Sequence, residues 1–155
     1  MNRTPVMARR VLYVAEPAPV WASRPPVVVD CSVLSAVLWA EPAVDDALLR
    51  LAGRSLHAPD LLCYELANVA RNKARSGVPA PVARAGLEAF AEQRVALRCI
   101  DMQRAFDVAL RWSLTAYDAA YLCLAAELRA PLITFDKRLG EAAARYLKGP
   151  EQGPP

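Results

Sequence analysis

Short apolar segments rich in β-branched residues alternate along this chain with longer segments of helical periodicity. The clearest is 27–31, Val-Val-Val-Asp-Cys, which follows two prolines and is typical of a strand buried on both faces. Weaker strand patterns lie at 55–58, 95–100 and 131–135. Strands that alternate with helical segments predict a single α/β domain, with a central parallel sheet of four to five short strands and helices on both sides.

Helical segments fill most of the chain between these strands. The pattern predicts them at 32–40, 44–51, 61–75, 81–93, 102–112, 115–128 and 137–146. Glu41-Pro42 separates the first two, and Asp60 is predicted to be the N-cap of the third. In 102–112, the spacing predicts that Phe106 and Leu110 face the core.

The chain of 155 residues is long enough for one domain, and its 55% hydrophobic content excludes a disordered protein. We expect the domain at 27–148, preceded by a flexible extension at 1–26 and followed by a disordered tail at 149–155. The apolar stretch at 11–15 ends at Glu16 and Pro17, so it is shorter than the apolar region of a secretory signal. Because no apolar run approaches the roughly 18 residues of a membrane span, we expect no membrane association and a cytoplasmic protein.

Cysteine and histidine usage restricts the metals that this protein could bind. The four cysteines are scattered without a CxxC pair and there is one histidine, which argues against a zinc site and against a disulfide framework. Any metal must therefore be held by oxygen ligands, which favours Mg²⁺ or Mn²⁺. The net charge of +3 is only a weak indication of a polyanionic partner.

Two acids lie at or just after the ends of predicted strands. Asp30 belongs to the strand at 27–31 and Asp136 follows the strand at 131–135, and each could simply cap the next helix. If the two strands are neighbours in a parallel sheet, both carboxylates lie at one sheet edge, where open α/β sheets bind their ligands.

Two further acids fall near predicted helix starts. Glu65 has Leu62 and Val69 on its face of the helix, which directs it toward the core side and favours a functional role, with a solvated position or interaction with the helix dipole as the alternatives. Asp118 follows Thr115 by three residues, which a capping box explains fully. The helix behind Asp118 is apolar nearly all round, however, and a buried helix would bring this acid to the sheet edge.

Four carboxylates gathered at one edge would repel one another and raise each other's pKa unless a cation lay among them. A divalent ion resolves this conflict, and Mg²⁺ sites typically combine a few carboxylates with waters that leave room for a phosphate oxygen. The predicted chemistry is hydrolysis of a phosphodiester by a metal-activated water.

A set of segments agrees in order and spacing with one known family. The segments are Val28-Val29-Asp30-Cys31-Ser32, Ala58-Pro59-Asp60-Leu61, Glu65-Leu66-Ala67-Asn68, Thr115-Ala116-Tyr117-Asp118-Ala119-Ala120-Tyr121 and Ile133-Thr134-Phe135-Asp136-Lys137-Arg138-Leu139. In them the chain resembles the PIN-domain nucleases, and most of all the ribonuclease toxins of VapC type. The likeness covers roughly 27–147, and it is the ordered set rather than any single segment that is specific.

The resemblance implies a Mg²⁺- or Mn²⁺-dependent endoribonuclease that is the toxin of a type II, VapBC-like toxin–antitoxin pair. The acidic set that it implies for catalysis and metal binding is Asp30, Glu65, Asp118 and Asp136, with Ser32, Asn68 and Thr134 in supporting positions. The implied partners are an RNA substrate, a cognate antitoxin and a second copy in a homodimer. The family's usual last strand is expected to be very short or missing, because the chain becomes rich in Gly and Pro after Lys148.

Other functions stay open at this point. One is a catalytically silent PIN module that acts by binding a partner, and another is a housekeeping nuclease that processes RNA. A phosphotransfer enzyme with Asp30 as nucleophile would need a second acid two residues on, where Ser32 stands. The helix dipole explains the basic residues at the end of 61–75, with RNA phosphate as the alternative partner; these are Arg71, Lys73 and Arg75.

Overall fold

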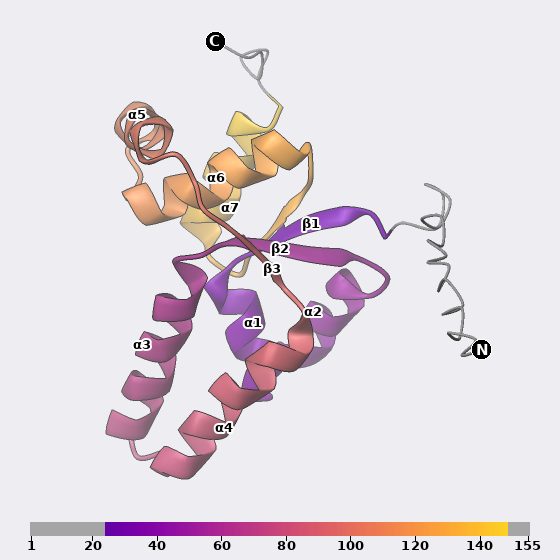
Figure 1. The fold of residues 1–155 in the computed structure, drawn as a ribbon, viewed down its shortest axis with the longest axis vertical. Helices are drawn as coiled ribbons and strands as arrows, with labels where there is room; N and C mark the ends of the chain where they lie inside the picture. The colour runs from indigo at the N-terminus through magenta and orange to yellow at the C-terminus, as the bar shows by residue number, and fades with distance from the viewer. Residues whose placement is uncertain (1–23, 149–155) are drawn as a thin grey trace, which may run out of the picture.

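The computed structural model describes residues 24–148, in which short strands alternate with longer helices (Figure 1). The elements in chain order are β1 (Pro26–Val29), α1 (Cys31–Leu38), α2 (Val44–Leu51), β2 (Ser55–Pro59), α3 (Leu62–Arg75), α4 (Ala80–Phe90), the 3-10 turn η2 (Ala91–Gln93), β3 (Ala96–Arg98), α5 (Met102–Trp112), α6 (Ala116–Leu128), β4 (Leu132–Ile133) and α7 (Lys137–Tyr146). Within this part of the chain, no helix has the length and apolar character needed to cross a bilayer. The predicted tail at 149–155 and most of the predicted extension at 1–26 lie outside the described residues.

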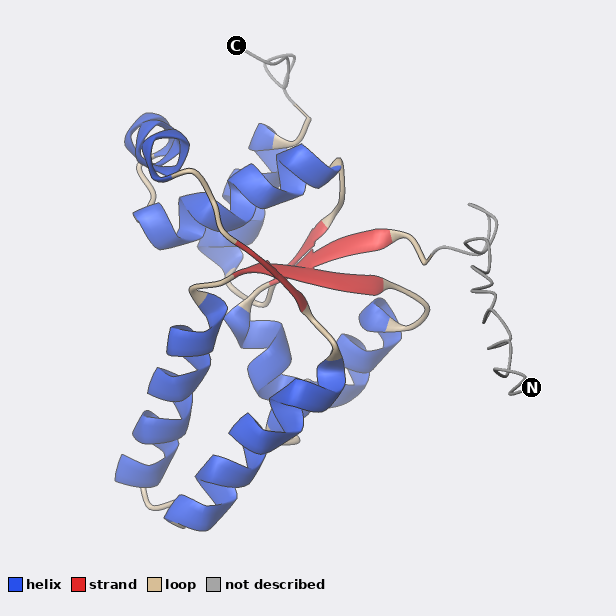
Figure 2. Ribbon diagram, in the orientation of Figure 1, coloured by secondary structure: helices blue, strands red, loops and turns tan. Residues whose placement is uncertain are grey.

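A four-stranded parallel sheet forms the centre of the described domain (Figure 2). The strand order is β3-β2-β1-β4, so β1 is an interior strand between β2 and β4. The residues from Val27 to Val29 are 0% exposed, as their β-branched run predicts. The α/β fold with a parallel sheet is therefore confirmed, with four strands in residues 24–148.

The order of the strands creates a crevice beside β1. The chain moves outward from β1 through β2 to β3, and then returns to the other side of β1 with β4. Val28 lies opposite Leu132 and Val29 opposite Ile133, which brings the carboxyl ends of β1 and β4 together. A doubly wound sheet binds its ligands where the strand order reverses in this way.

Helices cover both faces of the sheet. Helices α1 to α4 lie on one side, α6 and α7 lie on the other, and α5 packs on α6 (Figure 1). Every residue from Ala119 to Ala125 in α6 is buried, because this helix packs against β1, β2, α5 and α7. The apolar character of α6 on all sides thus agrees with its central position.

Most element types are as expected, and the differences are local. The bounds of α2, α5 and α7 agree with the sequence prediction, whereas β3 and β4 are shorter than predicted. The prediction of Asp60 as an N-cap is wrong, because α3 begins at Leu62 with Leu61 as its N-cap and no side-chain capping bond. Asp60 instead lies in the β2–α3 turn, where its backbone N–H donates to the carbonyl of Arg98 at 2.9 Å.

The outer face of α5 is apolar, contrary to expectation. Phe106 and Leu110 were predicted to face the core, but they are 60% and 72% exposed, and Met102 is 82% exposed. These residues are spaced four apart and form one outward row, while the buried residue of α5 is the small Ala105. The prediction was wrong because α5 packs on α6 through the face that contains Ala105, with Val108, Ala109 and Trp112 half-buried on the same side.

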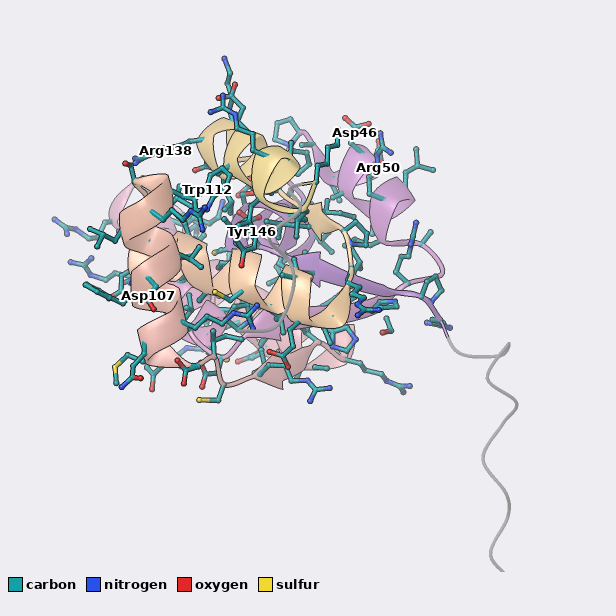
Figure 3. The ribbon with its side chains drawn as sticks, turned by 90° about the horizontal axis from the view of Figure 1, so that it is seen from above. Asp46, Arg50, Asp107, Trp112, Arg138 and Tyr146 are labelled. Carbon is teal, nitrogen blue, oxygen red and sulfur yellow. The ribbon has the colours of Figure 1, made fainter. Side chains whose placement is uncertain are left out.

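Contacts between α5 and α7 fix the C-terminal helices (Figure 3). The rings of Trp112 and Tyr146 meet edge to face, with centroids 5.7 Å apart and planes at 90°. Near the start of α7, the guanidinium of Arg138 donates to the carbonyl of Ser113 in the α5–α6 connection. The ring contact holds the end of α7 beside α5, and the Arg138 contact holds the first turn of α7 beside the segment that leads into α6.

Candidate active site

The first acid, Asp30, lies in the turn between β1 and α1 and is only 6% exposed. It is the N-cap of α1, since Oδ1 accepts from the backbone N–H groups of Ser32 at 3.0 Å and Val33 at 3.3 Å. Burial raises the pKa of Asp30, although hydrogen bonds from Ser32, Thr134 and Val33 act in the opposite direction. The surroundings of Asp30 therefore stabilise its ionised form only in part.

Two hydroxyl groups join the turn after β1 to the turn after β4. Ser32 Oγ donates to Asp30 Oδ1 at 2.7 Å and accepts from the backbone N–H of Phe135 at 2.9 Å. Thr134 Oγ1 donates to Asp30 Oδ2 at 2.8 Å and accepts from the backbone N–H of Asp136 at 2.8 Å. The structure thus places two of the predicted supporting residues, Ser32 and Thr134, directly on Asp30.

The second acid, Glu65, projects from the first turn of α3 and is held by a residue of α6. Tyr121, which is 2% exposed, donates its hydroxyl to Glu65 Oε2 at 2.5 Å. Burial raises the pKa of Glu65, the Tyr121 hydrogen bond lowers it, and the charges of Asp30 and Asp118 raise it, with a net upward shift. The three carboxylates are thus electrostatically coupled.

The other two acids lie on the more open side of this region. Asp118 is half-buried in the first turn of α6, where its backbone N–H donates to Thr115 Oγ1 at 3.0 Å. Asp136 is exposed and caps α7, with Oδ1 accepting from the N–H of Leu139 at 2.9 Å. Among the described residues, the carboxylate of Asp118 has no hydrogen bond, so only its backbone takes part in the helix cap.

All four predicted acids line one pocket of about 630 Å³, together with a fifth carboxylate from the α1–α2 connection. We call this the acidic pocket, and its acids are Asp30, Glu41, Glu65, Asp118 and Asp136. Asn68, the remaining predicted supporting residue, is exposed on α3 and is not among the pocket residues, whereas its neighbour Val69 is.

The donors of the acidic pocket fit a hard divalent cation. Five of its twelve lining residues carry carboxylates, and the chain's single histidine, His57, lies on β2 outside it. Within residues 24–148, no three His, Cys, Asp or Glu side chains are already arranged to enclose a metal ion. A pocket that leaves space among its acids suits Mg²⁺ or a similar ion, which takes few protein ligands and keeps several waters.

Cys31 also lines the acidic pocket, but its chemistry is different. Burial, with the charges of Glu65 and Asp30, raises the pKa of its thiol to about 12. A group with this pKa is protonated at neutral pH, so Cys31 is not a thiolate nucleophile. The cysteines at 31, 63, 99 and 123 are all free, as the sequence predicted.

Sequence reasoning missed the roles of two residues of this region, Tyr121 and Glu41. Tyr121 lies three residues after Asp118 on α6, so the two share one helix face, which is a signal that the sequence contains. In the sequence, Glu41 is recognisable only as part of a helix break. Its partner Lys73 lies 32 residues away along the chain, and no local pattern predicts such a pair.

Both the sequence and the fold of this chain match known proteins. Residues 27–145 match the PIN domain family, and the chain belongs to that family. It is 32% identical over 120 residues to Ribonuclease VapC3 of Pyrobaculum aerophilum, covering 74% of this chain and 92% of that protein. Its fold is similar to the crystal structure of PAE2754 from Pyrobaculum aerophilum, with a TM-score of 0.62 and 27% identity over 78% of this chain and 80% of that one. The resemblance to VapC-type PIN domains is therefore confirmed.

Proposed function

We propose that this chain is a metal-dependent endoribonuclease and the toxin of a VapBC-like toxin–antitoxin pair. The acidic pocket carries the proposal, since it gathers four carboxylates at the carboxyl edge of the sheet in a PIN domain. The similarity to Ribonuclease VapC3 supports RNA as the class of substrate.

Four acids are the proposed metal ligands, directly or through waters, with Mg²⁺ or Mn²⁺ as the ion; these are Asp30, Glu65, Asp118 and Asp136. When bound, the ion would supply an activated water and neutralise charge on the scissile phosphate. Asp30 provides a fixed ligand position because Ser32, Val33 and Thr134 orient its carboxylate. Asp118 provides an adjustable one, because no hydrogen bond within residues 24–148 holds its carboxylate.

Tyr121 keeps Glu65 oriented toward the acidic pocket. Burial and the neighbouring Glu65 raise the pKa of the Tyr121 hydroxyl, so it stays protonated and donates to Oε2. Tyr121 is thus a positioning residue that acts through Glu65, and its own oxygen is not available as a base.

The proposed partners follow from the same pocket and from the family. A cognate antitoxin would place basic side chains against the carboxylates of the acidic pocket and so block RNA from it. We further propose a homodimer and a cytoplasmic site of action. Light scattering of the purified protein tests the dimer, and a monomeric mass at micromolar concentration would contradict it.

RNA cleavage by the purified protein tests the nuclease. We expect cleavage of structured RNA with Mg²⁺ or Mn²⁺, none with excess chelator, and a loss of at least about 100-fold in Asp30→Asn. Asp107→Asn is the matched control, because Asp107 is exposed on α5 and outside the acidic pocket. If Asp30→Asn cleaved RNA as well as the wild type does, the proposed site would be contradicted. If neither protein cleaved RNA, a catalytically silent module would be favoured.

The growth of cells that express this protein distinguishes a toxin from a housekeeping nuclease. Induced wild-type protein is expected to arrest growth and Asp30→Asn is not. If a small open reading frame lies beside this gene, its co-expression should restore growth, and its product should co-purify with this chain. Unimpaired growth with the active enzyme would favour the housekeeping alternative.

A further inference from the structure

The fifth carboxylate of the acidic pocket, Glu41, is outside the proposed metal set. It lies in the short connection between α1 and α2, and it faces the same pocket as Asp30 and Glu65. An uncompensated fifth charge there would add to the repulsion that already raises the pKa of Glu65. The surroundings of Glu41 therefore decide how negative the acidic pocket is.

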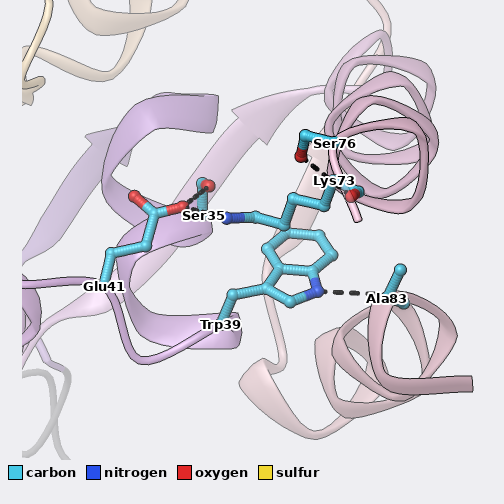
Figure 4. Close-up of polar contacts among 6 residues, drawn as sticks. All are labelled: Ser35, Trp39, Glu41, Lys73, Ser76 and Ala83. Carbon is cyan, nitrogen blue, oxygen red and sulfur yellow. Dashed lines mark hydrogen bonds and ion pairs between the residues drawn. The ribbon is translucent and has the colours of Figure 1, made fainter. Parts of the chain in front are cut away.

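Glu41 is held as an ion pair on the wall of the acidic pocket (Figure 4). Its Oε1 accepts from Lys73 Nζ at 2.6 Å and from the hydroxyl of Ser35 at 2.7 Å, and Ser35 is 6% exposed. Burial alone would raise the pKa of Glu41, but the hydrogen bonds from Lys73 and Ser35 and the charge of Lys73 lower it overall. Glu41 is thus ionised at neutral pH, and its charge is balanced by Lys73.

Lys73 is held in place from a third element, α4. Its Nζ lies 5.4 Å from the centroid of the Trp39 ring, and the indole Nε1 donates to the carbonyl of Ala83 at 3.3 Å. Gly86 makes room for this ring, because a Cβ there would come within 2.4 Å of Trp39 Cε2. Residues of α1, α3 and α4 therefore build the position of this one ammonium group (Figure 4).

The other ion pair between lysine and glutamate in residues 24–148 is a solvent-exposed pair, and it serves as a comparison. Lys137 and Glu141 are one turn apart on α7, with 3.9 Å between charged atoms and side chains 87% and 58% exposed. Lys73 and Glu41 are 23% and 34% exposed at 2.6 Å, so solvent screens them less. A pair of this kind influences its surroundings more than a surface pair does.

We infer that Lys73 and Glu41 are positioning residues that set the charge of the acidic pocket. Lys73 keeps the Glu41 carboxylate paired on the wall, so that four carboxylates rather than five face a bound cation. The inference rests on the proposed function, because it concerns the affinity of the same pocket for a divalent ion and for RNA. It also gives Lys73 a role other than the dipole interaction or direct RNA contact expected from its place near a helix end.

The inference predicts changes of opposite sign for the two partners. Lys73→Met leaves five uncompensated acids, so Mn²⁺ should bind about threefold to tenfold more tightly and RNA more weakly. Glu41→Gln leaves the Lys73 charge unbalanced, so Mn²⁺ should bind about threefold to tenfold more weakly and RNA more tightly. The double variant should return both affinities close to those of the wild type. If the ion pair had only a structural role, both single variants would instead shift the Mn²⁺ affinity in the same direction.

Calorimetric titration of the RNA-free protein with Mn²⁺ measures this directly, with the KM for RNA as the second readout. Arg75→Met is the matched control, because Arg75 is an exposed cation on the same helix with no ion pair in the described residues. Its loss should leave the Mn²⁺ affinity within about twofold of that of the wild type, since an exposed charge is screened by solvent. Melting temperatures identify any variant that fails to fold, and Lys73→Arg, which keeps the charge, should then restore near wild-type affinity.

Shifts of the same sign in both single variants, or no shift in either, would overturn the inference and leave the proposed function intact. A wild-type protein that binds no Mn²⁺ would contradict the proposed function and this inference with it. An equal shift in Arg75→Met would also overturn the inference, because any nearby cation would then have the same effect.

Discussion

Asp30 and Asp136 have similar settings in the sequence and different ones in the fold. Each comes after a strand and caps the following helix through Oδ1. Asp30 is 6% exposed and its Oδ2 accepts from Thr134, whereas Asp136 is exposed and its Oδ2 has no hydrogen bond within residues 24–148. The difference arises because β1 is an interior strand and β4 is at the edge of the sheet.

The comparison shows that one carboxylate can cap a helix and also bond to a neighbouring strand end. One oxygen of Asp30 caps α1 while the other joins the neighbouring strand end, and burial raises the pKa of the whole carboxyl group. We therefore expect stability and activity to oppose each other at Asp30, as they commonly do in active sites. Asp136 is exposed and caps a helix, so we expect no opposition between stability and activity at that position.

The largest effect should come from replacing each acid by asparagine. Asp30→Asn should lower RNA cleavage by at least about 100-fold and raise the melting temperature of the metal-free protein, since it removes a buried charge. Asp136→Asn should leave the melting temperature nearly unchanged, because asparagine caps a helix as well as aspartate. Cleavage assays and thermal unfolding followed by circular dichroism in chelator measure both. An equal rise in melting temperature for the two variants would break the comparison.

Removing the hydroxyl that joins the two acids should have the next largest effect. Thr134→Val leaves Asp30 Oδ2 without its donor and the N–H of Asp136 without its acceptor. We expect a loss of about 1–3 kcal/mol in the free energy of unfolding and roughly tenfold slower cleavage, because Asp30 is less well oriented. Thr134→Ser retains the hydroxyl and should stay close to the wild type. Denaturant unfolding and cleavage rates test this, and a Thr134→Val protein as active as Thr134→Ser would count against the bridge.

A smaller effect is expected at Glu65, which lies on helix α3 and does not follow a strand as Asp30 and Asp136 do. Tyr121→Phe removes the hydrogen bond to Glu65 that favours the ionised carboxylate, so the pKa of Glu65 should rise further. The acidic limb of the pH–rate profile should then move to higher pH, with a few-fold lower rate at neutral pH. Tyr117→Phe is the control, since Tyr117 is on the same helix and 65% exposed. An unshifted acidic limb in Tyr121→Phe would show that Glu65 does not control it.

The smallest effect should be the pH dependence of stability in the metal-free protein. Because the pKa of Asp30 is raised in the folded state, that state binds the proton more tightly than the unfolded chain does. This contribution to stability grows as the pH falls from neutral through the raised pKa, and it is complete below the unfolded-state pKa of about 4. The difference between wild type and Asp30→Asn in urea unfolding at pH 5, 6 and 7 isolates it, since Glu41, whose pKa is lowered, has the opposite influence. A difference that does not change with pH would contradict the assignment.

The sequence predicted what depends on local pattern and on the ordered set of family segments. Helices such as α2 and α7 agree with prediction to the residue, and the structure brings Asp30 and Glu65 into one pocket. Predictions that depend on tertiary packing were less reliable. Phe106 faces outward because α5 packs on α6 through the face that contains Ala105, and Glu41 could not be assigned without knowing that Lys73 lies beside it.

The hydrogen bond between Thr134 and Asp30 joins residues 104 positions apart. A chain synthesised from its N-terminus therefore exposes Asp30 and Glu65 long before β4 is available to complete the sheet. An interrupted translation product that ends before Thr134 would contain both acids without the hydroxyl that orients the first of them. If this chain has the proposed function, a nuclease assembled in this order would become active late in its own synthesis, and an antitoxin already present would have time to reach it.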